Sequence, residues 1–113
     1  MVRYILEVRT NCSDPQKEAE YNDWYNTIHL PDVLETEGVV RATRYENTDP
    51  AEGDAKFVAI YEIETDDIDT FMVVLSENVQ KKREAGRMND LLVRTHRGLY
   101  KQTYTLSADK DQQ

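Results

Sequence analysis

Residues 21–32 read Tyr21-Asn-Asp-Trp-Tyr-Asn-Thr-Ile-His-Leu-Pro-Asp32 and contain the only tryptophan of this 113-residue chain. At 3.6 residues per turn, the apolar side chains of this stretch fall on one face of a helix. They are Tyr21, Trp24, Tyr25 and Ile28. Proline disfavours the α conformation of the residue before it, so the helix is predicted to end at Leu30, and Pro31 is predicted to open a new turn.

His29 lies one turn after Tyr25 and is therefore predicted at a helix C-terminus. The unpaired carbonyls there favour an imidazolium by about 0.3–1 kcal/mol, which makes His29 a candidate proton donor or anion ligand. Tyr25 is a candidate donor to a developing oxyanion, and Asp32 could fix the imidazole ring. In the alternative interpretation, Trp24 packs in the core, His29 caps carbonyls or pairs with Asp32, and Asp32 stabilises the following turn.

The segments on either side predict two halves of similar length. Asp14 is a suitable N-cap with Pro15 at the first helical position, so the first helix is predicted over Pro15–His29. Thr65 is predicted to cap a second helix, and the polar segment Val79–Val93 is predicted to be partly helical. Strands are predicted from composition and alternation over Val2–Arg9, Val39–Glu46, Lys56–Glu64 and Thr95–Leu106.

This order of elements predicts an α+β fold of the ferredoxin-like type, βαββαβ, in one domain over residues 1–113. Its four-stranded antiparallel sheet carries helices on one face only. Large residues of the last two strands would lie on the uncovered face, and a second copy of the chain would bury them. We therefore predict a homodimer.

The net charge of −8 argues against binding to nucleic acid or to anionic membranes, because both need a basic surface. Cys12 is the only cysteine, so an intrachain disulfide and a thiolate metal cluster are excluded. No apolar run is long enough for a membrane span, and the N-terminal residues lack a signal peptide's apolar core. We expect a cytoplasmic protein without a metal site, since its two histidines lie far apart in sequence.

Several landmarks resemble the dimeric α+β barrel superfamily, especially its EthD-like and antibiotic-biosynthesis-monooxygenase-like members. They are Asp23-Trp24-Tyr25, His29-Leu30-Pro31-Asp32, Gly38-Val39 and Arg44-Tyr45. The resemblance implies a pocket between sheet and helices and a dimer formed through the sheets. Within it, His29 matches the histidine of the His-Leu-Pro segment, and Trp24 with Tyr25 matches the aromatic pair beside it.

The superfamily includes cofactor-free monooxygenases, polyketide cyclases, lactone isomerases and haem-degrading enzymes. We therefore expect a cofactor-independent enzyme that acts by acid/base chemistry on a small apolar or aromatic carbonyl compound, as a cyclase, isomerase or monooxygenase. His29, Tyr25 and Asp32 are the predicted catalytic residues, and Trp24 and Tyr21 are predicted to contact the substrate.

His96 and Tyr100 are predicted to add substrate contacts if their face of the last strand is turned toward the pocket; otherwise they are surface residues. Two further alternatives are open. One is a non-catalytic binding module in which His29 anchors an anionic or phenolic group. The other is a haem-handling enzyme, because an imidazole in an apolar pocket is the minimum that a haem site needs. Val79–Val93 would form a lid over the pocket or a dimer arm.

Overall fold

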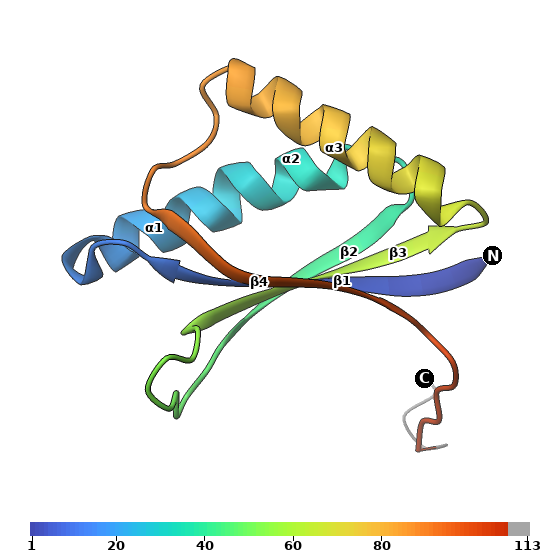
Figure 1. Ribbon diagram of the computed structural model, residues 1–113, viewed down its shortest axis with the longest axis horizontal. Helices are drawn as coiled ribbons and strands as arrows, with labels where there is room; N and C mark the ends of the chain where they lie inside the picture. Colours follow the sequence, from blue (N-terminus) through green and yellow to red (C-terminus); the bar gives the residue numbers. More distant parts are fainter. Residues whose placement is uncertain (109–113) are drawn as a thin grey trace.

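The computed structural model describes residues 1–108 and consists of one sheet with all helices on one side (Figure 1). Its strands are β1 (Val2–Cys12), β2 (Val39–Glu46), β3 (Phe57–Thr65) and β4 (Leu92–Lys101). They pair in the order β2-β3-β1-β4, and each neighbouring pair is antiparallel. The predicted α+β ferredoxin-like fold is confirmed.

The first helical segment is longer than predicted and changes its winding three times, from 3-10 to α, to π and back to α. It comprises η1 (Pro15–Lys17), α1 (Glu18–Trp24), η2 (Tyr25–His29) and α2 (Leu30–Leu34). The predicted start is confirmed, since the Asp14 side chain accepts a hydrogen bond from the Gln16 N–H and Pro15 occupies the first turn.

The predicted end of this helix at Leu30 is wrong, because η2 is a π-helical turn. The Leu30 N–H donates to the Tyr25 carbonyl, five residues back. A π turn shifts the hydrogen-bond register by one residue, which accommodates a proline that an unbroken α-helix would exclude. His29 consequently lies inside a continuous helical segment, and it has no exposed helix end beside it.

The second half also differs from the prediction at its boundaries. Asp67, rather than Thr65, caps α3 (Ile68–Glu84) by accepting from the Thr70 N–H. The helix includes the first part of the segment that was predicted to be partly helical, and β4 starts at Leu92 and ends at Lys101. The core lies between the helices and the sheet. None of the described helices is long and apolar enough to cross a membrane.

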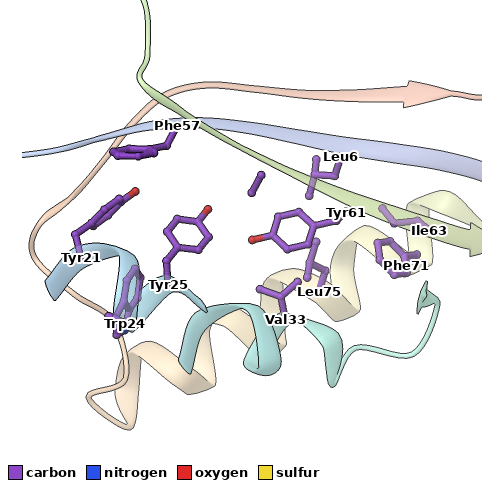
Figure 2. Packing of buried hydrophobic residues seen from close by; sticks show 11 residues of the cluster. Leu6, Tyr21, Trp24, Tyr25, Val33, Phe57, Tyr61, Ile63, Phe71 and Leu75 are labelled. Carbon is purple, nitrogen blue, oxygen red and sulfur yellow. The ribbon is translucent and has the colours of Figure 1, made fainter. Parts of the chain in front are cut away.

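Strand β3 supplies the central row of the core, as its alternation predicts. Its inward side chains are almost fully buried: Phe57, Ala59, Tyr61 and Ile63. The helices cover them with a second group of buried residues, Tyr21, Trp24, Tyr25, Val33, Phe71 and Leu75. Figure 2 shows that the hydroxyls of Tyr25 and Tyr61 point toward one another inside this cluster. The core thus carries polar atoms at its centre, and these belong to the site described next.

Candidate functional site

A pocket of about 650 Å³ lies between the sheet and the helices. Its apolar wall is formed by Leu6, Val8, Val33, Leu75, Val79, Met88 and Leu92. Three polar side chains, Tyr25, His29 and Tyr61, reach it from the interior. Its exposed rim is formed by Ser76, Gln80, Arg83, Asp90, Arg94 and Arg97. Both the volume and the mixture of apolar wall and few polar groups are typical of sites for small organic molecules.

The imidazole of His29 is fixed by two aromatic neighbours. It stacks on Trp24 with 4.9 Å between ring centroids, and the Tyr25 ring meets it edge-on at 5.0 Å. Burial lowers the pKa of His29 to about 4, while the nearby Asp32 opposes this shift and Arg44 adds to it. The predicted imidazolium is therefore wrong: at neutral pH the ring is uncharged and can accept a proton.

This lowered pKa predicts that His29 makes the protein sensitive to acid. The unfolded chain takes up the proton near pH 6.5, but the native state takes it up only near pH 4, so native stability falls with falling pH between these values. From pH 7 to pH 5, the wild-type protein should lose about 2 kcal/mol more unfolding free energy than the His29→Gln variant. Urea unfolding at both pH values measures this difference, and equal losses would contradict the assignment.

The phenols of Tyr25 and Tyr61 are buried O–H donors that line the same pocket as His29. Tyr25 is 1% exposed, and among the described residues its hydroxyl has no hydrogen-bond partner of ordinary geometry. Burial raises the pKa of Tyr25 and raises that of Tyr61 well above its ordinary value, so both stay protonated at neutral pH. The Arg44 guanidinium lies 4.2 Å from the centre of the Tyr25 ring. The Tyr25 hydroxyl interacts with the Tyr61 hydroxyl outside ordinary hydrogen-bond geometry, so a ligand that hydrogen-bonds to it is favoured.

Asp32 has a different partner from the predicted one. The residue is 4% exposed, and its carboxylate accepts two hydrogen bonds from Arg87, at 2.7 Å from Nε and 3.0 Å from Nη2. These bonds are the main reason that the pKa of Asp32 lies below its ordinary value. Within residues 1–108 no hydrogen bond joins Asp32 to His29, so we correct its role: it ties α2 to the loop between α3 and β4.

Tyr21 and Trp24 do not line the pocket, contrary to the prediction that they contact substrate. Tyr21 is fully buried, and its hydroxyl shares a hydrogen bond of 2.5 Å with that of Thr10. Trp24 lies behind His29 and donates its indole N–H to the Arg87 carbonyl at 2.9 Å. Both residues support the site from the core.

His96 and Tyr100 lie on the opposite face of the sheet. The register pairs them with Arg9 and Ile5, whereas the neighbouring positions Leu6 and Val8 face the pocket. Both side chains approach Glu7, with His96 Nε2 at 3.7 Å and the Tyr100 hydroxyl at 3.4 Å from its carboxylate. Their predicted part in substrate binding is wrong, and the surface alternative holds.

Sequence reasoning missed Tyr61 and the arginines of the rim. The sequence did contain a signal for Tyr61, because it places a hydroxyl among the inward-facing apolar positions of β3. The segment predicted to be a lid or dimer arm contributes Arg83, Met88 and Asp90 to the wall and rim of the pocket. Among residues 1–108 no three His, Cys, Asp or Glu side chains gather as metal ligands would.

Solved structures with this fold were found, although no curated protein matches the chain in sequence. HapK from Hahella chejuensis is 13% identical, with a TM-score of 0.63 over 93% of this chain and 97% of that one. SnoaB, a cofactor-independent oxygenase from Streptomyces nogalater, is 20% identical, with a TM-score of 0.61 over 95% and 97%. An EthD family protein from Bacillus halodurans is 12% identical, with a TM-score of 0.55 over 91% and 100%.

At these identities the likeness concerns the fold. The matched structures are dimeric α+β barrel proteins, so the resemblance read from the sequence is confirmed. The sequence profile of one family, described as "Domain of unknown function (DUF4286)", matches residues 3–101. Because this match spans most of the chain, the protein belongs to the DUF4286 family and has the dimeric α+β barrel fold.

Proposed function

We propose that this protein is a cofactor-independent enzyme that removes a proton from a small apolar or aromatic carbonyl compound. The observation that carries the proposal is the juxtaposition in one pocket of an uncharged imidazole, His29, with two protonated phenols, Tyr25 and Tyr61. One group accepts a proton and the others donate hydrogen bonds to the negative charge that its removal creates.

In the proposed step, a ring nitrogen of His29 takes a proton from the carbon next to the substrate carbonyl. The electron pair of the broken C–H bond moves to the carbonyl oxygen, and the Tyr25 and Tyr61 hydroxyls donate to this oxyanion. An imidazole of low pKa is a weak base alone. The oxyanion that forms beside it stabilises the imidazolium, and the apolar wall strengthens this attraction.

The fate of the enolate decides the type of reaction. Protonation at another carbon gives an isomerase, and attack on a second carbonyl of the same molecule gives a cyclase. Reaction with dioxygen gives a monooxygenase, and the shared fold with the cofactor-independent oxygenase SnoaB supports this third outcome. All three begin with the same proton transfer.

Deuterium exchange tests this first step without knowledge of the natural substrate. The uncharged ketone 2-tetralone, which has an acidic C–H next to its carbonyl, is incubated with the protein in D₂O and followed by NMR. Faster exchange than in buffer supports the enzyme. Binding of several such ketones without exchange would identify the alternative, a binding module, and a strong visible band on adding hemin that is lost in His29→Gln would identify a haem protein.

Tyr25→Phe should separate a functional hydroxyl from a structural one. We expect the exchange rate to fall by roughly tenfold. This is a smaller effect than the removal of a single oxyanion donor usually has, because Tyr61 supplies a second hydroxyl. Stability should change by about 1 kcal/mol at most, since the lost hydroxyl interacts with the Tyr61 hydroxyl but makes no hydrogen bond of ordinary geometry to a described residue. Exchange rates and urea unfolding of both proteins measure the two effects. A less stable variant with normal exchange would show that the hydroxyl serves the fold.

We further propose that a second copy covers the open face of the sheet, as these folds typically form dimers. That face carries the half-exposed side chains Ile5, Tyr45 and Tyr100 beside Val58 and Ile60 of β3. Burial of such a surface is favourable because it removes apolar area from water.

A further inference from the structure

The register of β4 contains a bulge that changes where its arginines point. His96 pairs with Arg9, and the next pair joins Arg94 to Thr10, so Thr95 is an extra residue without an opposite partner. In a regular strand, residues three apart such as Arg94 and Arg97 lie on opposite faces. The bulge turns both toward the helices, and both line the pocket.

These arginines, and Arg83 at the end of α3, have no ion pair among the described residues. The chain has 22 acidic against 14 basic residues. Four of the other five arginines and two lysines form an ion pair with a carboxylate: Arg3, Arg9, Arg41, Arg87, Lys56 and Lys82. Three of the four arginines without an ion pair among the described residues thus gather at one rim, while the fourth, Arg44, donates to Asn26 and lies over the Tyr25 ring.

The charge at the rim is opposite to that of the whole protein. Three arginines line the pocket together with a single acidic residue, Asp90, whereas the chain as a whole has a net charge of −8. A local positive potential within an acidic surface attracts anions to that point. The planar guanidinium also matches a carboxylate through two parallel hydrogen bonds.

We propose that the natural ligand of the pocket is an amphipathic organic acid, an aromatic or polyketide-like carbonyl compound that also carries a carboxylate. Its carboxylate binds between Arg94 and Arg97, with Arg83 nearby. Its apolar part lies along the wall and presents the carbonyl to Tyr25 and His29. This inference rests on the proposed function and specifies the class of its substrate.

Two fluorescent probes with the same fused-ring skeleton test the charge requirement. 8-Anilinonaphthalene-1-sulfonate is an anion, and N-phenyl-1-naphthylamine is its uncharged counterpart. Arg94→Gln/Arg97→Gln should lower the affinity for the anionic probe by at least ~10-fold and change the affinity for the neutral probe little. Only the anionic probe loses hydrogen bonds between charged groups. The matched control is Lys81→Gln/Lys101→Gln, which removes two exposed charges outside the pocket, one from α3 and one from β4.

Ser76→Phe locates the probes, because Ser76 is an exposed residue of the rim and the larger ring would obstruct the pocket. We expect the anionic probe to lose its binding to this variant, which would place the probe in the pocket. The inference is overturned if the anionic probe still binds to Ser76→Phe. It is also overturned if the arginine variant lowers the affinity for both probes equally, or for neither. The proposed function has a separate readout, wild-type exchange at 2-tetralone, an uncharged ketone that needs no arginine.

Discussion

His29→Gln should slow deuterium exchange at 2-tetralone by roughly 10²–10⁴-fold, the range for loss of a general base, while the ketone still binds. Glutamine keeps a polar side chain of similar reach but cannot take up a proton. Because Trp24, the only tryptophan, stacks on the His29 ring, its fluorescence reports ketone binding in the wild-type protein. NMR exchange rates combined with such titrations separate proton transfer from binding, and isothermal calorimetry measures binding in the variant.

The matched control is His96→Gln, which changes the other histidine on the opposite face of the sheet and should leave the rate unchanged. The pH profile gives a second check. Since the pKa of His29 is about 4, kcat/KM should stay level between roughly pH 6 and 8 and fall only as the pH approaches that value. A normal rate in His29→Gln would assign proton removal to another group.

Arg87→Gln should have the largest effect on stability, a loss of about 3 kcal/mol, at the low end of the range for breaking a buried ion pair. The Asp32 side chain is 6% exposed and would keep a buried charge without a partner. The Arg87 side chain is already 45% exposed, so its replacement removes little buried surface. Urea unfolding at pH 7 measures the loss of unfolding free energy.

Two variants make this prediction specific. In Asp32→Asn/Arg87→Gln the buried charge is also removed, so part of the lost stability should return. Lys82→Gln breaks the more exposed Lys82–Glu35 pair, which is 2.6 Å long, and should cost only about 0.2–1 kcal/mol. If Arg87→Gln cost no more than this surface pair, Asp32 would not depend on Arg87.

Acid should affect the wild-type protein through the same pair. The lowered pKa of Asp32 contributes stability that is fully present above the ordinary value of 3.8 and is lost as the pH falls through the native value. His29 acts earlier, between pH 6.5 and about 4, so the two groups contribute in successive pH ranges.

The sequence by itself determined the order of elements, the strand β2 to its ends, the Asp14 cap and the buried face of β3. These features depend on local properties, namely side-chain period, capping residues and turn residues, which neighbouring positions in the chain fix. The order of elements, together with the Trp-Tyr, His-Leu-Pro, Gly-Val and Arg-Tyr landmarks, was likewise enough to recognise the fold and to place His29 and Tyr25 at the pocket.

Only the tertiary structure decided the chemistry of the site. The charge of His29 depends on its burial by residues from other segments of the chain. Asp32 accepts its hydrogen bonds from Arg87, which is 55 residues away in sequence. A bulge in the pairing of β4 with β1 decided which face of the sheet carries Arg94. A π turn allowed the helical segment to continue past Pro31. Burial, long-range pairing and strand register arise from contacts between distant segments, and no local pattern specifies them.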